Sequence, residues 1–204
     1  MSDSAIPDFI DARRSIRLFT DRPVPDDLLD RWILAACAAP APHHSRPWRF
    51  VVVVSPAGRA ALAAGMGAAW RADLASDGVD PERIDALVAA SHRKVESAPA
   101  LVLGCLTADG LDHYPDAARQ QAEHGMALLS LGAAMENFML ACAHDGFASC
   151  WVAAPIFCPA AARDALELPE AWLPHAMVVV GEPDPGYVGR PRPPVPLETL
   201  SSRC

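Results

Sequence analysis

The sequence predicts a single α+β domain, residues 1–204, in which helices flank a central mixed sheet. Three observations lead to this prediction. The chain has 204 residues, 51% of them hydrophobic and 21% charged, which suffices for one buried core. Short apolar runs typical of strands are interspersed with longer stretches at helical spacing. The order of these segments follows no regular strand–helix repeat, which favours a mixed sheet.

The N-terminal segment is predicted to hold two helices with an extended stretch between them. Residues 7–13 favour a short helix, because proline is acceptable in a first helical turn, and 14–19 turn into an extended stretch. From Pro25 onward, acidic first-turn residues and apolar residues at helical spacing favour a second helix. This helix has to end at Pro40.

The central part is predicted to alternate between strands and helices. The loop 39–48 leads into 50–54, a continuous apolar run typical of a strand buried on both faces. Two alanine-rich helices are expected at about 56–76 and 81–97. A second strand follows at 101–106.

The C-terminal part is predicted to begin with a long helix, 116–145, which is apolar on more than one side and must be covered on most faces. A strand at about 148–153, a short helix at 159–167 and a last strand at 177–180 follow. Prolines and glycines then make 182–204 an extended arm with neither helix nor central strand. Composition leaves open whether the arm reaches across a partner subunit or is a disordered tail.

The charge of the chain limits its partners. A net charge of −8 argues against nucleic acid or an anionic membrane, because both require a positive face. An anion site must then be local. The apolar segment 125–143 approaches the length of a membrane span, but Glu136 and Asn137 make its insertion costly, so a buried core helix is expected. Nothing at the N-terminus resembles a signal peptide, and we expect a cytoplasmic protein.

Cysteine spacing favours buried free thiols over disulfides or a metal site, and no metal is expected. No two cysteines stand at C-x-x-C spacing, and several lie in apolar stretches. The six are Cys37, Cys105, Cys142, Cys150, Cys158 and Cys204.

A cluster of arginines near the N-terminus is the strongest candidate for a binding site. Arg13, Arg14 and Arg17 repel one another unless an anion or carboxylates compensate, and Ser15 adds a hydroxyl donor. Guanidinium forks match phosphate oxygens, so the cluster is a candidate phosphate site. The alternative is a basic surface turn whose arginines pair with nearby carboxylates, namely Asp8, Asp11 or Asp21.

Other candidate residues lie in the arm and in the first loop. Arg190 and Arg192 stand among prolines that limit their freedom and could close over the same phosphate, although a solvated tail remains the alternative. His43 and His44 lie in a loop position that often lines a ligand site, but adjacent histidines face different ways. The sequence contains no dinucleotide-binding glycine fingerprint, P-loop, zinc-protease motif or nucleophile elbow.

Taken together, these residues resemble the nitroreductase family of FMN enzymes. The matching features are an R-x-S-x-(R/K)-x-F start at 13–19, a loop ending in Pro-Trp at 39–48, a long buried helix, a G-x-x-(S/A) turn at 146–151 and a basic C-terminal arm. More narrowly, APAPHHSRPWRF, WRADLASDG and GFASCWV are similar to the C-terminal reductase domain of the coenzyme F420 γ-glutamyl ligase. The loop has His43 and His44 where the wider family often has serine and asparagine.

The resemblance implies a nitroreductase-like fold, an intertwined homodimer and FMN as the cofactor. It implies that the N-terminal cluster holds the FMN phosphate and ribityl chain, with Arg190 or Arg192 contributing from the arm; the cluster is Arg13, Arg14, Ser15, Ile16 and Arg17. Two further groups would border the flavin: Ala41, Pro42 and His43 from the loop, and Val152, Ala153 and Ala154, whose backbone N–H groups would lie near the flavin N5.

The resemblance implies no fixed catalytic side chain, because the flavin carries the redox chemistry. Trp70, Arg71 and Asp73 would lie where the family's lid covers the substrate, unless they are ordinary helix-surface residues. The implied reaction is reduction of the dehydro precursor of the deazaflavin coenzyme F420. The alternatives are a general NAD(P)H-dependent nitro, quinone or enone reductase, the flavin-fragmenting branch of the same fold, a flavin- or deazaflavin-binding protein without turnover, and a structural helical dimer.

Overall fold

The strands form one four-stranded sheet with the order β1-β2-β4-β3 in the computed structural model, which describes residues 8–189 and 191–203. Every neighbouring pair in this sheet is antiparallel. The strands are β1 (Trp48–Val53), β2 (Ala100–Leu106), β3 (Ala148–Val152) and β4 (Leu173–Gly181).

The prediction of a mixed sheet is wrong for these four strands. Strands β2 and β3 do run parallel to each other, but β4 lies between them and is antiparallel to both. The order in which strands enter a sheet is set by long-range packing, which hydrophobic patterning does not encode. Within the described residues, the only parallel pairing is an isolated bridge between Ser15 and Ser149 at the outer edge of β3.

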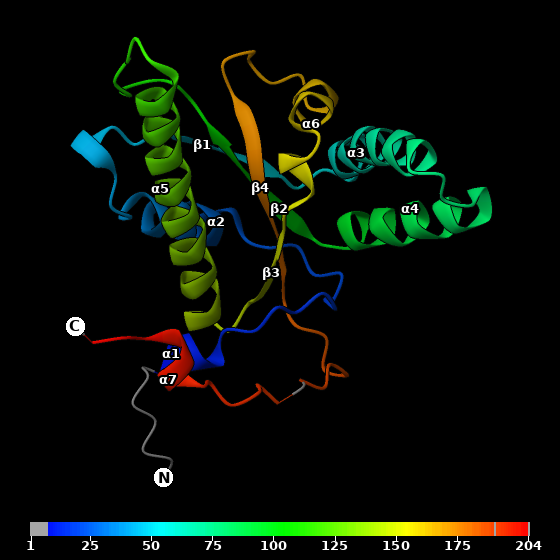
Figure 1. Ribbon diagram of the computed structural model, residues 1–204. Helices are drawn as coiled ribbons and strands as arrows, with labels where there is room; N and C mark the ends of the chain where they lie inside the picture. The colour runs from blue at the N-terminus through cyan, green and yellow to red at the C-terminus, as the bar shows by residue number, and fades with distance from the viewer. Residues whose placement is uncertain (1–7, 190, 204) are drawn as a thin grey trace.

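Helices cover both faces of the sheet (Figure 1). Alternate side chains of β2 divide between the two faces: Val102 packs into a core with α2 and α5, whereas Leu101 and Leu103 pack into a core with α3 and α6. The helix α4 packs along α3, farther from the sheet. The longer helices are α2 (Asp26–Cys37), α3 (Pro56–Ser76), α4 (Pro81–Glu96), α5 (Ala117–His144) and α6 (Pro159–Ala165).

Two short helices lie near the chain ends, α1 (Asp8–Ala12) and α7 (Leu197–Leu200). The helix α1 agrees with the predicted first helix. The prediction that the arm contains no helix is wrong at α7, where the prolines end at Pro196 and the following four residues are free to form one turn. Apart from a turn at 185–186, the rest of the described arm forms no helix or strand and is mostly exposed, with Tyr187 and the residues closest to the sheet half-buried.

The prediction that the first strand is buried on both faces is wrong, because one face of β1 is partly exposed. The strand is also an edge strand of the described sheet and pairs only with β2. Its Val52 is 37% exposed, and Val54 just after it is 47% exposed. A run of valines suits a pleated backbone at any position of a sheet, so it does not distinguish an edge from the centre. The last strand, β4, begins earlier than predicted, at Leu173. The prediction missed this start because Pro174 and His175 interrupt the apolar pattern of the strand.

The long helix α5 has the length and apolar composition of a membrane span, by those two criteria alone. The prediction of a core helix is confirmed on one side, where Leu131, Met135 and Phe138 are buried. Its other side carries Met126 and Leu129, the latter 77% exposed. An apolar surface therefore remains uncovered along this helix in the single chain.

The prediction of free thiols is confirmed for the cysteines that the structure describes, all five of which are unpaired. Burial raises the pKa of Cys105 to about 12 and also raises the pKa of Cys142. These thiols therefore stay neutral and act as small apolar core residues. Cys204 lies outside the described residues.

Candidate functional site

The two ends of the chain meet in a cavity of about 710 Å³, which we call the arginine pocket. One wall comes from the stretch after α1 and the other from the arm. The lining residues are Arg13, Arg14, Ser15, Arg17 and Leu18 on the first wall, and Gly186, Tyr187, Val188 and Arg192 on the second.

The first wall is held against the outer edge of β3. The Ile16 N–H donates to the Ser149 carbonyl at 3.0 Å, and Ser15 forms the parallel bridge with Ser149. This pairing keeps the segment extended beside the sheet, so that its side chains alternate between two directions. Ile16 lines a smaller neighbouring cavity, with Phe147 and Pro183, and is absent from the lining of the arginine pocket.

The second wall is fixed by hydrogen bonds at the start of the arm. The Thr20 N–H donates to the Glu182 carbonyl at 2.9 Å, and the Asp184 N–H donates to the Leu18 carbonyl at 3.1 Å. The Asp184 carboxylate then accepts from the Gly186 N–H at 2.7 Å. This turn carries the chain back over the cavity and brings Tyr187 into its lining.

Positive charge dominates the arginine pocket. Among the described residues, two carboxylates pair with its arginines: Glu136 lies 3.2 Å from the Arg13 Nε, and Asp11 lies 3.0 Å from Arg192. Arg192 also donates to the Arg13 carbonyl, which ties the arm to the cluster. No ion pair of Arg17 occurs within the described chain.

Asp11, one of the carboxylates expected near the cluster, pairs with Arg192 of the arm. The described lining of the cavity holds four arginines and no carboxylate. A cavity with guanidinium forks, the Ser15 hydroxyl and an excess of positive charge fits a phosphate group. Just behind it, burial raises the pKa of the Cys150 thiol while Arg17 and Arg13 oppose this, so the thiol stays neutral and adds no charge.

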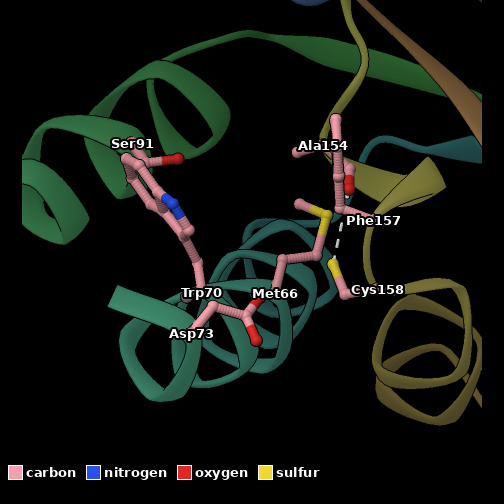
Figure 2. A pocket seen from close by; sticks show the side chains of 8 residues that line it. Met66, Trp70, Asp73, Ser91, Ala154, Phe157 and Cys158 are labelled. Atoms are coloured by element: carbon pink, nitrogen blue, oxygen red, sulfur yellow. Dashed lines mark hydrogen bonds between the residues drawn. The ribbon is translucent and has the colours of Figure 1, made fainter. Parts of the chain in front are cut away.

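A second cavity, of about 420 Å³, lies where α3 and α4 meet the turn after β3; we call it the aromatic pocket (Figure 2). Trp70 and Ser91 stand on one side of it, and Ala154, Phe157 and Cys158 on the other. Phe157 is 81% exposed, which is unusual for so large an apolar side chain. The lining residues are Met66, Gly67, Trp70, Asp73, Ser91, Ala154, Phe157 and Cys158.

Helical spacing explains which residues of α3 reach this pocket. Met66, Trp70 and Asp73 follow one another at intervals of four and three residues and therefore share one face of the helix. Arg71 faces elsewhere and pairs with Asp85 of α4 at 2.7 Å. The structure thus brings two of the three predicted substrate residues together and places Arg71 outside the lining.

A close helix crossing shapes the base of the aromatic pocket. A Cβ atom at Gly67 would lie only 2.2 Å from the His92 Nε2, so glycine allows α3 and α4 to approach here. The His92 Nε2 is buried against Gly67 and has no hydrogen-bond partner among the residues that the structure describes. Gly67 therefore has a packing role, consistent with the missing dinucleotide fingerprint.

The strand β3 joins the two pockets. Ser149, its second residue, lies behind the arginine pocket, and the turn after its end places Ala154 in the aromatic pocket. At about 3.3 Å per residue, the strand separates the two cavities by roughly 15 Å. Ala153 and Ala154 open the short 3-10 helix Ala154–Ile156, whose first N–H groups have no partner within the helix. A molecule with an anionic end and a planar end fits this spacing.

The loop residues Ala41, Pro42 and His43 lie far from both pockets, before β1 at the opposite edge of the sheet. Ala41 and Pro42 line a shallow hollow of about 260 Å³ beside Met126 and Leu129 of α5. His43 is exposed and lies 3.8 Å from Asp112. A single chain does not bring these residues to the arginine pocket.

The remaining predicted residues lie outside the linings of the two pockets or outside the described part of the chain. Arg190 lies outside the described residues. Val152 ends β3 and, like Ala153, is absent from the lining of both pockets. Sequence analysis missed Tyr187 and Phe157; an isolated aromatic in a proline-rich arm was a usable signal for the first. No cluster of three or more potential metal ligands occurs in the described part of the chain.

Comparisons with known proteins identify the family of this chain. A family model described as "Nitroreductase family" matches residues 10–182. The iodotyrosine deiodinase of Haliscomenobacter hydrossis is 40% identical over 48 residues, which are 24% of this chain and 22% of that protein. A putative NADH dehydrogenase/NAD(P)H nitroreductase of Methanothermobacter thermautotrophicus is 48% identical over 44 residues, 22% of this chain and 23% of that protein. These matches thus span less than a quarter of the relatives' length.

Solved structures match over a much longer part of the chain. A nitroreductase family protein from Streptococcus pneumoniae TIGR4 superposes with a TM-score of 0.72 at 20% identity, covering 96% of this chain and 98% of that chain. The NADPH:FMN oxidoreductase from Vibrio harveyi superposes with a TM-score of 0.68 at 21% identity, covering 96% of this chain and 75% of that chain. At such identities, the likeness shows a shared fold.

Proposed function

Because this chain belongs to the nitroreductase family, we propose that it is an FMN-dependent oxidoreductase whose flavin lies along β3. The observation that carries the proposal is the placement of the arginine pocket and the turn at Ala153 and Ala154 at opposite ends of one strand. FMN has a phosphate at one end and a planar ring at the other, which suits this arrangement. When bound, it supplies hydride transfer at its N5 atom.

The residues of this chain bind and orient the cofactor in this proposal. Arg13, Arg17 and the Ser15 hydroxyl hold the phosphate, and Arg192 closes over it from the arm. Because Glu136 and Asp11 already pair with Arg13 and Arg192, the phosphate shares these arginines with the carboxylates. The N–H groups that open the 3-10 helix are then free to donate to the ring.

We also propose a two-fold homodimer. The uncovered stripe of α5 at Met126 and Leu129 adjoins the hollow at Ala41 and Pro42, and apolar residues along the arm are between 65% and 86% exposed. A second copy of the chain would cover these surfaces. In such a dimer, the loop 41–43 of one subunit borders the flavin of the other, which accounts for its distance from the arginine pocket within one chain.

The dimer is tested by Leu129→Glu, which places a charge at the centre of the proposed interface. We expect the sedimentation coefficient to fall from that of a dimer to that of a monomer, and retained FMN to fall with it. Ala89→Glu, on the exposed face of α4, is the matched control and should stay dimeric. A dimer that survives Leu129→Glu would refute this interface.

Two acceptor classes are compatible with the proposed chemistry. The proposed substrate is the dehydro precursor of the deazaflavin coenzyme F420, supported by the similarity of residues 39–50, 70–78 and 146–152 to the reductase domain of the F420 ligase. The second candidate is general NAD(P)H-dependent reduction of nitro compounds, quinones or enones. It is supported by the activities for which the similar Vibrio harveyi and Methanothermobacter proteins are named. We place the enzyme in the cytoplasm, where free thiols persist.

The test follows the flavin absorbance of the reduced, FMN-loaded protein under anaerobic conditions as each acceptor is added. Reoxidation by the dehydro-deazaflavin at a rate well above that with a simple quinone supports the first candidate. Comparable rates with quinone, nitro and enone acceptors support the second. Flavin that stays bound but is reoxidised by no acceptor would instead indicate a flavin-binding protein without turnover.

A further inference from the structure

The aromatic pocket contains one ionisable carboxylate and no compensating cation. Its lining consists of apolar and aromatic side chains together with the Asp73 carboxylate, the Ser91 hydroxyl and the Cys158 thiol. No hydrogen bond or ion pair of the Asp73 side chain occurs among the described residues. The nearest guanidinium on the same helix, Arg71, is held by Asp85 on the side facing α4.

The other polar groups of the pocket do not offset this charge. The Cys158 thiol donates to the Ala154 carbonyl at 3.4 Å and is neutral. Burial raises its pKa, and the nearby Asp73 carboxylate adds to that rise. The His92 imidazole presents its unpartnered nitrogen to Gly67 and does not line the cavity.

We propose that Asp73 is a specificity-determining residue, which makes the aromatic pocket select planar acceptors that are uncharged or cationic at the ring and reject those with an anionic ring substituent. The proposal rests on the proposed function, because it takes the pocket beside Ala154 as the place where the acceptor meets the flavin. Trp70 and Phe157 supply flat apolar surfaces for an aromatic ring. Asp73 accepts a hydrogen bond from a donor on that ring, and repels a carboxylate placed there.

The pocket charge bears directly on the two acceptor classes. A deazaflavin precursor can bind in the pocket only if its ring alone enters and its phosphate and carboxylate groups point away from Asp73. A neutral nitroaromatic or quinone can bind without such a restriction. The selectivity thus concerns the charge on the ring and applies to both classes.

The test compares two ligands of nearly the same shape, benzamide and benzoate, binding to the oxidised, FMN-loaded protein. Neither is reduced by the flavin, so calorimetry measures affinity without turnover. We expect benzamide to bind more tightly in the wild type, and Asp73→Asn to narrow the ratio of the two dissociation constants by about fivefold, the scale of a partly exposed charge interaction. Asp77→Asn, on the exposed end of the same helix, should leave the ratio unchanged.

A second readout uses the reducible pair 4-nitrobenzamide and 4-nitrobenzoate. In its first step, a nitro group takes two electrons and two protons from the reduced flavin and gives a nitroso group and water. Reduction potentials differ between the two acceptors but are common to all variants, so the change in the ratio of kcat/KM values isolates Asp73. The same fivefold narrowing is expected in Asp73→Asn.

The outcomes separate the inference from the function beneath it. If the wild-type protein retains no FMN, the proposed function fails whatever Asp73 does. If FMN is retained and the ratios are equal in wild type and Asp73→Asn, only the inference is overturned. If Asp73→Asn weakens FMN binding and leaves the ratios unchanged, the carboxylate faces the flavin, which also overturns the proposal.

Discussion

Replacing Arg13 and Arg17 together by alanine is expected to abolish retention of FMN. Both side chains line the arginine pocket, and each charge-assisted hydrogen bond to a phosphate contributes about 1.5–3 kcal/mol. Their combined loss corresponds to a dissociation constant raised at least about hundredfold. The measurement is the visible absorption spectrum of the purified protein after addition of FMN and removal of the excess.

A matched control removes the same charge elsewhere. Arg83 and Arg93 are exposed on α4 and belong to neither pocket, so the Arg83→Ala, Arg93→Ala double variant should keep the flavin spectrum of the wild type. If the Arg13→Ala, Arg17→Ala variant retains the flavin, the phosphate does not bind in the arginine pocket. If the wild type itself binds no FMN in a titration, the interpretation as a structural helical dimer takes the place of the flavoprotein.

Asp145→Ala is expected to destabilise the fold by about 2–3 kcal/mol, because it leaves a buried indole N–H without a partner. Trp32 is fully buried and donates to the Asp145 Oδ2 at 2.6 Å, and Arg31 pairs with the same oxygen at 2.6 Å. Asp145 follows the last turn of α5, so these bonds tie that end of the helix to α2. Urea unfolding at pH 7 and fixed protein concentration measures the loss, with the exposed Asp30→Ala as the control.

The same carboxylate makes part of the stability acid-sensitive. The hydrogen bond from Trp32, with a further contribution from Arg31, holds the pKa of Asp145 below its usual range. A carboxyl with a lowered pKa in the folded state stabilises the fold fully above the pKa of the unfolded state, about 3.9. This stabilisation is lost as the pH falls through the pKa of the folded state. Asp145→Asn keeps an acceptor for Trp32, so at pH 7 it should destabilise the fold less than Asp145→Ala does. Below pH ~4, the Asn variant should lose less of its unfolding free energy than the wild type does. An equal acid response in both proteins would contradict this assignment.

Local signals predicted the helices accurately because those signals are complete within a few residues. The break between α3 and α4 combines Gly78, at a φ of 73°, with Asp80, whose carboxylate accepts from the Glu82 and Arg83 N–H groups. Both helices accordingly begin and end within one residue of their predicted bounds. The order of the strands had no such local signal, since it depends on which apolar faces meet across the whole chain.

Some residues of the site could likewise be predicted from local sequence and others could not. The arginine cluster was apparent from the close spacing of its residues, whereas Tyr187 joins it only because the Asp184 turn carries the arm back over the cavity. Helical spacing already separated Trp70 and Asp73 from Arg71, so the sequence held enough information to leave Arg71 out of the pocket lining. Phe157 gave no such signal, because its exposure follows from the packing of the turn after β3.

The two walls of the arginine pocket come from residues 13–18 and 186–192, almost the whole length of the chain apart. The second wall follows the last strand, β4, by only a few residues, so it is among the last parts of the chain to be synthesised. A polypeptide that stops after β4 contains every core strand but only half of the phosphate site. Losing the arm would therefore remove Tyr187 and Arg192 from the cavity while leaving Arg13, Ser15 and Arg17 on the first wall in place.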